Sequence, residues 1–365
     1  MADSAECEDQ IARLRLIRSE TIGPVTYWQL LARFGSASAA LEAVPSLAAR
    51  GGGRPPAIAS RASVEREMAA VAKLGARYLF RGRPEYPALL GEVESAPPAL
   101  IAQGRLALLQ RPAIAMVGAR NASAAACRFA RQLAQGLGQE NVVIVSGLAR
   151  GIDTAAHDGS LETGTIAVVA GGIDVVYPPE NAERQRLIGE RGLLLAEQPP
   201  GLEPRARHFP WRNRIIAGIA QGSVVVEAAP KSGSLITARF AAEFGRDVMA
   251  VPGSPLDPRA QGCNQLIREG AILVQSAADI LEMLRPFDLR PVAEGSEAYT
   301  GPASPAEVGE ADRARVVGLL SPTPVAVDEI IRQSGLPPAV VQTILLELEL
   351  GGRLERHAGG RASIG

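Results

Sequence analysis

The feature that most constrains the fold of this chain is a regular alternation of short apolar runs and longer helical stretches between residues 112 and 285. The apolar runs occupy residues 113–118, 142–146, 165–170, 192–196, 223–228, 247–251 and 271–274. Helices are predicted between them, at residues 123–138, 152–162, 180–190, 212–220, 234–245 and 276–284. Strands that are apolar throughout and alternate with helices are typical of a parallel sheet covered on both faces. The sequence therefore predicts an α/β domain with a Rossmann-like, doubly wound, mainly parallel sheet.

A smaller region precedes this domain. Residues 1–85 are predicted to be mostly helical, since Ile11 and Leu14 share one helical face. A turn containing Gly23 and Pro24 then leads into a second helix. This order resembles a small helical domain of the SAM or helix-hairpin-helix kind, and a helix-hairpin-helix unit holds DNA phosphates through its backbone amides. An ordinary helical bundle is equally consistent, because the turn carries no Lys or Arg.

The predicted sheet domain takes in residues 86–285, with 86–110 as a lead-in, and a linker rich in Pro and Gly covers 286–311. The last segment, 312–365, shows three helical stretches followed by a hairpin pattern, the order of a winged-helix domain. Its third helix, 338–350, contains no Lys or Arg and two acids. We therefore expect this domain to contact protein or to pack against the rest of the chain, although Arg353, Arg356 and Arg361 on the hairpin leave a weaker DNA role open.

Charge and cysteine content narrow the function classes. Lys and Arg total 38 and Asp and Glu total 39, so the net charge is −1 and any polyanion site must be a local cluster. The only lysines are Lys73 and Lys231. The three cysteines show no CxxC spacing, which fits a reducing compartment. With no signal peptide at the acidic start and no apolar run long enough to span a membrane, we expect a cytoplasmic protein.

Small and cationic residues follow the predicted strands where those strands end. In an open α/β sheet, ligands bind in the crevice at the carboxyl ends of the strands. Glycines there bring backbone N–H groups close to a ligand, and helix starts attract anions. The cations expected to meet in one crevice are Arg120, Arg150, Arg212, Arg214 and Lys231. Hydroxyl donors at one helix start come from Ser232, Ser234 and Thr237. The combination predicts a site for a polyphosphate or a nucleic-acid backbone.

Several enzyme classes lack their motifs here. The chain has no GxxxxGK[ST] phosphate loop and no GxGxxG after the first strand, which disfavours ATPases and dinucleotide-binding enzymes. His157, His208 and His357 show neither metal-ligand spacing nor a nucleophile partner. His157, beside Asp158, is predicted to be a packed or capping residue, and Glu227 is as consistent with structural hydrogen bonding as with catalysis. We expect no catalytic residue, no cofactor and no metal.

Five segments carry a family resemblance. They are SGLARGID (146–153), YPPEN (177–181), FPWRNRIIAG (209–218), SGSLITA (232–238) and VPGSP (251–255). In this order they resemble the DNA-processing protein A family, also called DprA or Smf, over about residues 112–275, and the flanking regions resemble those of its longer members. The first loop departs from the family pattern, with Ala119 before Arg120 and Ala124-Ala125 in place of Tyr-Gly, and Gly171-Gly172 departs in a later loop.

The resemblance implies a non-enzymatic protein of natural transformation and recombination that binds and protects incoming single-stranded DNA and helps to load the recombinase RecA. It also implies a homodimer formed through the Rossmann-like domain. The family's basic pocket maps onto the cations named above, with Gly147, Gly151, Ser232, Gly233 and Ser234 as phosphate contacts. Asn213, inside the matched FPWRNRIIAG segment, and Thr237 complete the predicted DNA-binding set.

Two other functions stay open. The first is a nucleotide phosphoribohydrolase of the lysine-decarboxylase-like family, but Phe240 stands where the glutamate of its PGGxGTxxE stretch would fall. The second is a structural adaptor whose arginines form only surface ion pairs. Aromatic residues make up 4% of the chain, and Phe209, Trp211 and Tyr177 are the ones near the predicted groove. We expect Phe209 and Trp211 to be packing residues, and strand binding to depend mainly on phosphate contacts and therefore on salt.

Overall fold

The computed structural model describes residues 2–284, 308–357 and 359–364, with the side chains of 2–5 left aside. The chain divides into two compact units, one made of residues 67–292 and one made of residues 1–66 together with 293–365. The predicted linker, 286–311, lies almost entirely outside the described residues.

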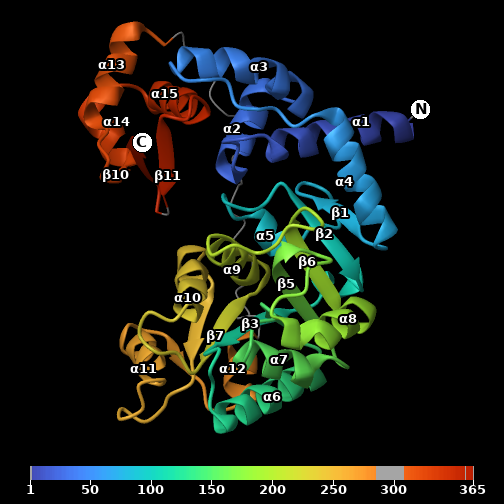
Figure 1. Cartoon of the computed structure of the whole chain (residues 1–365). Helices are drawn as coiled ribbons and strands as arrows, with labels where there is room; N and C mark the ends of the chain where they lie inside the picture. Colours follow the sequence, from blue (N-terminus) through green and yellow to red (C-terminus); the bar gives the residue numbers. More distant parts are fainter. Residues whose placement is uncertain (1, 285–307, 358, 365) are drawn as a thin grey trace, which may run out of the picture. The chain divides into compact units, whose positions relative to one another are not determined.

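The larger unit is built on a nine-stranded sheet with the order β1-β2-β6-β5-β4-β3-β7-β8-β9 (Figure 1). Its strands are β1 (Arg77–Phe80), β2 (Ala99–Gly104), β3 (Ala113–Gly118), β4 (Val143–Ser146), β5 (Thr165–Gly172), β6 (Leu193–Gln198), β7 (Gly222–Val226), β8 (Asp247–Ala250) and β9 (Ile272–Leu273). All neighbours are parallel except β1 with β2 and β2 with β6. The predicted mainly parallel sheet is confirmed.

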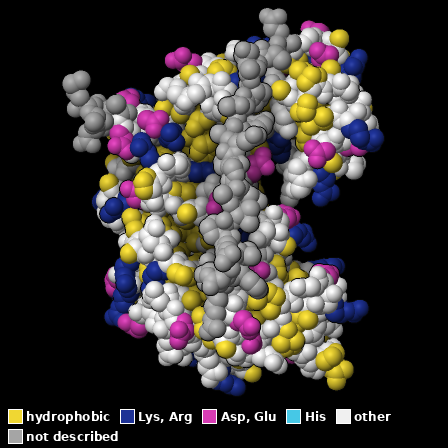
Figure 2. Space-filling view, turned by 180° about the vertical axis from the view of Figure 1, so that it is seen from behind, with side chains coloured by type: hydrophobic (Ala, Val, Ile, Leu, Met, Phe, Trp, Pro, Cys, Tyr) yellow, Lys and Arg dark blue, Asp and Glu magenta, His cyan; other side chains and the backbone are white. Residues whose placement is uncertain are grey.

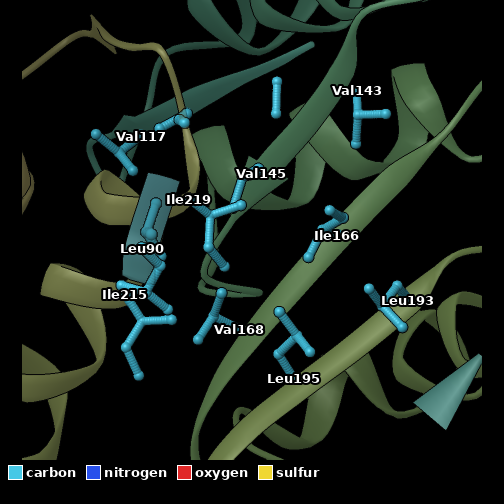
Figure 3. Packing of buried hydrophobic residues seen from close by; sticks show 14 of the residues in the cluster. Leu90, Val117, Val143, Val145, Ile166, Val168, Leu193, Leu195, Ile215 and Ile219 are labelled. Atoms are coloured by element: carbon cyan, nitrogen blue, oxygen red, sulfur yellow. The ribbon is translucent and has the colours of Figure 1, made fainter. Parts of the chain in front are cut away.

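Helices cover both faces of this sheet. They are α5 (Ala88–Gly91), α6 (Ala124–Gln139), α7 (Ile152–Ser160), α8 (Ala182–Arg191), α9 (His208–Ile219), α10 (Ser234–Glu243), α11 (Gln261–Arg268) and α12 (Ala277–Leu284). Residues of α5, α9, α10 and α11 pack on one face, and those of α6, α7 and α12 pack on the other. Figure 3 shows the first of these cores, where Val145, Ile166 and Val168 of the strands meet Ile215 and Ile219 of α9.

The strand order places the switch point of the fold beside β3. From β3 the chain adds β4, β5 and β6 on one side, and it then returns to add β7, β8 and β9 on the other. Loops leaving β3 and β7 therefore diverge to opposite sides and open a crevice at the carboxyl ends of the strands, which is where ligands bind in such sheets.

Some predicted boundaries are wrong. The strand β1 pairs with β2, so the sheet begins before residue 86, and the lead-in 86–110 contains β2 as a sheet strand. Helix α9 begins at His208, earlier than the predicted residue 212. Helix α13 (Glu310–Leu319) begins inside the predicted linker. The missed elements are short or next to prolines, which weakens their periodicity.

The smaller unit joins the N-terminal and C-terminal parts of the chain. Its N-terminal helices are α1 (Ala2–Arg18), α2 (Pro24–Phe34) and α3 (Ala37–Arg50), while α4 (Arg61–Lys73) contains the division between the units. The C-terminal part has α13, α14 (Val327–Ser334) and α15 (Pro338–Leu350) with a sheet of β10 (Val325–Ala326), β12 (Arg361–Ile364) and β11 (Leu354–His357). Three helices with this small sheet confirm the predicted winged-helix domain.

No helix among the described residues is long and apolar enough to cross a membrane. Within the same residues, no cluster of His, Cys, Asp and Glu has the composition of a metal site. Basic and acidic side chains are interspersed on the face shown in Figure 2, in keeping with the net charge of −1.

Candidate nucleic-acid interface

A cleft opens at the carboxyl ends of β3, β4, β5 and β7, and it consists of two adjoining pockets. The inner pocket, of about 350 Å³, is walled by Tyr177 and Pro178. The outer pocket, of about 550 Å³, is lined by the loop from Pro230 to Ser234. The two pockets share several residues, Arg120 and Arg212 among them, and therefore form one continuous groove.

The predicted DNA-binding residues largely come together in this cleft. Those that line one or both pockets are Arg120, Gly147, Arg150, Arg212, Asn213, Lys231, Ser232, Gly233, Ser234 and Thr237. Gly151 and Arg214 line neither pocket. The expectation that separate loops converge at one edge of the sheet thus agrees with the structure, and the exceptions have distinct physical reasons.

Two exposed cations mark the opening of the cleft. The guanidinium carbon of Arg120 lies 5.2 Å from the centroid of the Phe209 ring, a cation–π contact that holds the charge between the two pockets. Lys231 is exposed in the outer pocket. Among the described residues, neither side chain pairs with a carboxylate, so both charges are available to an anionic ligand.

The loop before α10 has the chemistry of an anion site. Gly233 precedes α10, and the first backbone N–H groups of the helix find acceptors within the loop itself. The Ser234 N–H donates to the Ser232 hydroxyl at 3.4 Å, and the next two N–H groups donate to the carbonyls of Ser232 and Gly233. The Ser232 and Ser234 hydroxyls are 2.8 Å apart, and the Asn213 amide donates to the Gly233 carbonyl at 3.2 Å. Lys231 has a φ of 69°, an uncommon value for a residue with a side chain. The loop therefore has an uncommon backbone conformation, in which two hydroxyls and one charged side chain line the outer pocket together.

Hydrogen bonds from buried polar side chains hold the backbone of the loop after β4. The Asp153 carboxylate accepts hydrogen bonds from the amides of Gly147 at 3.1 Å and Ala149 at 3.3 Å. The Asn181 amide donates to the Leu148 carbonyl at 2.8 Å. Gly151 has a φ of 73° and lies where a Cβ would come within 2.2 Å of the Ala119 carbonyl oxygen. Gly151 thus brings two loops together, which differs from the predicted phosphate contact.

Arg212 was predicted to bind phosphate, but its guanidinium is hydrogen-bonded to the backbone of the domain, although the residue also lines the cleft. Only 6% of its surface is exposed. Its Nη1 donates to the Gly147 carbonyl and, at 2.7 Å, to the Val168 carbonyl, so it joins the residue after β4 to the middle of β5. Burial lowers the pKa of Arg212 to about 10, which leaves the guanidinium charged at neutral pH. Burial raises the pKa of Asp153, and the positive charge of Arg212 opposes that rise.

The other two arginines predicted for the cleft, Arg214 and Arg150, differ in burial and in position. Arg214 is buried and pairs with Glu197 at 2.6 Å, so its predicted place in the cleft is wrong. Arg150 lies at the rim, where it pairs with Glu180 on the exposed surface. Water screens such an exposed pair, so Glu180 competes only weakly with a phosphate for Arg150.

Aromatic side chains contribute more to this region than predicted. Trp211 is 49% exposed and Tyr177 is 47% exposed, which contradicts the interpretation of Trp211 as a packing residue. The Arg207 guanidinium lies 5.8 Å from the Trp211 ring centroid, and the Tyr177 and Phe209 rings are 5.4 Å apart. Phe209 is partly buried, as expected.

Two further cleft residues were not singled out from the sequence. Asn121 lines both pockets and Arg259 lines the outer one. Asn121 follows Arg120 directly after β3, so its place at a strand end was an available signal. Arg259 lies in an irregular segment after β8, where no local pattern predicts its position.

The two candidate acid–base residues have structural roles. His157 is buried, as predicted, with its Nδ1 2.7 Å from the Thr165 hydroxyl, and burial lowers its pKa to about 3. The Glu227 carboxylate accepts hydrogen bonds from the amide of Ser123 at 2.8 Å and from its hydroxyl at 2.6 Å, next to the start of α6. These hydrogen bonds agree with the structural alternative for Glu227, in which its carboxylate binds groups at a helix start.

Comparison with known proteins agrees with this architecture. The family model for DNA recombination-mediator protein A matches residues 77–285, more than half of the chain. The model for a DprA-like N-terminal HHH domain matches residues 7–70, and that for a DprA winged helix domain matches residues 300–360.

Individual relatives and structures give the same result. The DNA processing protein DprA of Streptococcus pneumoniae is 50% identical over 198 residues, 54% of this chain and 70% of the relative. Protein Smf of Synechocystis is 36% identical over 318 residues, 78% of this chain and 79% of the relative. The DprA structure from Streptococcus pneumoniae superposes with a TM-score of 0.57 at 45% identity, over 61% of this chain and 77% of that one. For DNA processing protein A from Helicobacter pylori the TM-score is 0.53 at 26% identity, over 57% and 95%. With its sheet domain and both flanking domains matched, the chain belongs to the family of DNA recombination-mediator protein A, whose members are named DprA or Smf.

Proposed function

We propose that this protein binds single-stranded DNA in the cleft at the carboxyl edge of its sheet, and that it does so without catalysing a reaction on the strand. The observation that carries the proposal is the placement of Arg120 and Lys231 in one groove, beside the hydroxyls of Ser232 and Ser234 at the start of α10. Full charges and hydroxyl groups together are among the groups that bind a phosphate backbone.

The two pockets suggest how a strand would be held. Phosphates suit the outer pocket, because it contains Lys231, Ser232 and Arg259. Bases suit the inner pocket, which Tyr177 and Phe209 line. Stacking on an aromatic ring requires an unpaired base, and each such contact is worth roughly 1–3 kcal/mol. The arrangement therefore supports a preference for single over double strands.

The roles of the buried acids and bases support a binding protein over a nucleotide phosphoribohydrolase. Asp153, His157 and Glu227 each hold backbone or hydroxyl groups of the fold, so none is placed as a free acid or base in the cleft. Phe240, at the position of the hydrolase glutamate, stacks with Phe244 at 5.8 Å. Incubation with nucleoside monophosphates should release no free base, and release would support the enzyme.

The wider role we propose is in natural transformation and recombination in the cytoplasm, where the protein protects incoming strands and helps to load RecA. Support comes from family membership and from the single-stranded DNA binding mode of DNA processing protein A from Helicobacter pylori. We also propose a homodimer formed through the sheet domain. Light scattering tests the dimer, and RecA filament assembly on coated strands, with and without the protein, tests the hand-over.

The direct test of strand binding uses fluorescence anisotropy with single-stranded and duplex oligonucleotides over a salt series. The chain offers a matched control, because Lys73 on α4 is its only other lysine and is also exposed. We expect Lys231→Ala to weaken single-strand binding and to lower the slope of log K against log salt by about 0.7, the value for one lost phosphate contact on a single strand. Lys73→Ala should leave both unchanged.

The same titration can contradict the proposal. Equal affinity and equal salt slope for Lys231→Ala and Lys73→Ala would remove the outer pocket from the binding site. A wild-type chain whose DNA affinity does not change with salt would favour the structural adaptor.

A further inference from the structure

We propose that the N-terminal helices and the winged helix of this chain pack together through the faces that bind nucleic acid in other domains of these kinds. The two domains then form one joint unit and not a second DNA site. The inference concerns the smaller unit alone and does not depend on the function proposed for the cleft. It rests on the surroundings of α15 and of the first turn of α2 (Figure 1).

In a winged helix, the third helix is the usual recognition helix for DNA. Here that helix is α15, and its Leu346 and Leu350 belong to the same buried core as Leu16, Leu30 and Leu47 of the N-terminal helices. A recognition helix whose apolar residues complete the core of another domain is not available to a DNA groove.

The charges of α15 are also satisfied within the unit. Glu347 is only 2% exposed, and it accepts a hydrogen bond from Arg313 at 2.7 Å within its own domain. Across the interface, the Arg50 Nε of α3 lies 3.2 Å from the other carboxylate oxygen. A buried carboxylate is tolerated only when it is paired in this way. The acids that make α15 unsuitable for DNA are therefore the groups that bind the N-terminal domain.

The N-terminal side of the interface includes the start of α2. In a helix-hairpin-helix domain, this helix end is where a DNA phosphate binds. Here the hydroxyl of Thr26, in the first turn of α2, donates to Glu349 of the winged helix at 2.8 Å. Arg356 donates to the other oxygen of Glu349 at 2.8 Å and to Gln29 of α2 at 3.2 Å. A carboxylate of the chain itself thus lies beside the helix end that would otherwise attract a phosphate.

Two glycines after α3 allow the close approach of the two backbones. A Cβ on Gly51 would come within 2.0 Å of the Glu347 carbonyl oxygen, and one on Gly53 within 1.8 Å of the Gly351 carbonyl oxygen. Gly51 has a φ of −70°, which alanine also adopts. A methyl group at Gly51 or Gly53 would therefore meet the winged helix without straining its own backbone.

These glycines provide the test. We expect Gly51→Ala combined with Gly53→Ala to separate the faces in the full-length chain, with amide hydrogen exchange in α15 and α3 at least about tenfold faster than in the wild type. The matched control is Gly318→Ala on α13, where a Cβ meets nothing within 4 Å. Circular dichroism checks that the helices remain, and Glu349→Gln serves as a milder second variant, expected to raise exchange in α2 and α15 in the same sense.

A DNA measurement separates this inference from the function proposed for the cleft. In a chain carrying Arg120→Glu and Lys231→Glu, we expect no binding to single-stranded or duplex DNA at low salt, because the smaller unit offers no DNA face. Residual binding that disappears when residues 308–365 are removed would overturn the inference. Exchange rates in the glycine double variant equal to those of Gly318→Ala would overturn it as well.

Discussion

At the scale of single residues, the arginines of the cleft differ in burial, and burial decides what each one does. Arg120 is exposed and is held only by the face of an aromatic ring, so its charge can meet a ligand. Arg212 is buried and uses its guanidinium to join the residue after β4 to the middle of β5. Both follow the same rule of a cation near a strand end. The sequence could therefore predict that the two arginines converge. It could not predict which of them would be buried and hydrogen-bonded to the backbone.

Because the two side chains differ in burial, we expect the removal of Arg212 to affect stability and the removal of Arg120 to affect strand binding. Arg212→Ala should lower the free energy of unfolding by at least about 1–3 kcal/mol, because the Gly147 and Val168 carbonyls then lose a buried hydrogen-bond partner. Arg120→Ala should change stability by less than about 1 kcal/mol while weakening strand binding, since exposed substitutions cost little. Urea unfolding measures both values. A small loss for Arg212→Ala would mean that the ties to Gly147 and Val168 do not hold the loop.

His157 predicts a pH dependence of stability. Burial lowers its pKa in the folded state from 6.5 to about 3, with the nearby charges of Asp158 and Arg212 acting in opposite directions. Between these pH values the unfolded chain binds a proton that the folded chain does not, so the folded state loses stability as pH falls, by at most about 1.4 kcal/mol per pH unit.

The matching variant for this pH dependence is His157→Gln. We expect it to be less stable than the wild type above pH 6.5, where the imidazole is neutral in both states. The difference should shrink as the pH falls toward 4, because the variant has no group to protonate there. Urea unfolding at several pH values measures the difference. A difference that stays constant with pH would show that the pKa of His157 is the same in the folded and the unfolded chain.

At the scale of elements, the loops that build the cleft are packed against the rest of the domain on one side and face the cleft on the other. Gly151 sits against the Ala119 carbonyl at a positive φ, whereas a Cβ on Gly233 would meet nothing within 4 Å. Both glycines were predicted as phosphate contacts, yet only Gly233 faces the cleft.

These two glycines predict separable phenotypes. Gly151→Ala should cost roughly 1–3 kcal/mol of stability and displace the loops after β3 and β4, because the new Cβ has no room and the backbone is strained. Gly233→Ala should leave the melting temperature nearly unchanged and weaken strand binding, since its methyl group would occupy cleft space. Thermal unfolding together with anisotropy separates the two effects. A Gly233→Ala chain with wild-type affinity would place the strand away from this loop.

The element pattern shows where sequence reasoning succeeds and where it fails. The strands β3 to β9 were predicted because a strand buried on both faces is apolar throughout. The strand β1 was missed because Arg77–Phe80 is a four-residue edge strand, and β2 was missed because prolines precede it. The cleft residues at strand ends follow from topology, whereas Arg214 could not be placed, because its partner Glu197 lies on a different element.

At the scale of the whole molecule, the chain forms two units with separate cores. We expect calorimetry to show two unfolding transitions, because units without a shared core unfold independently. Leu30→Ala should lower the free energy of unfolding of the smaller unit, and Val145→Ala that of the larger unit. Each loss should be about 2–5 kcal/mol, which is typical of a core truncation. A single transition that moves with both variants would show that the units unfold together.

The discontinuous smaller unit has a consequence for how the protein is made. Thr26 and Glu349 are 323 positions apart, and at usual ribosomal speeds the second emerges on the order of tens of seconds after the first. All strands of the large sheet are synthesised within that interval. Translation therefore sets the order of events. The middle of the chain can fold first, and the apolar surface of the N-terminal helices that α15 covers stays exposed until α15 leaves the ribosome.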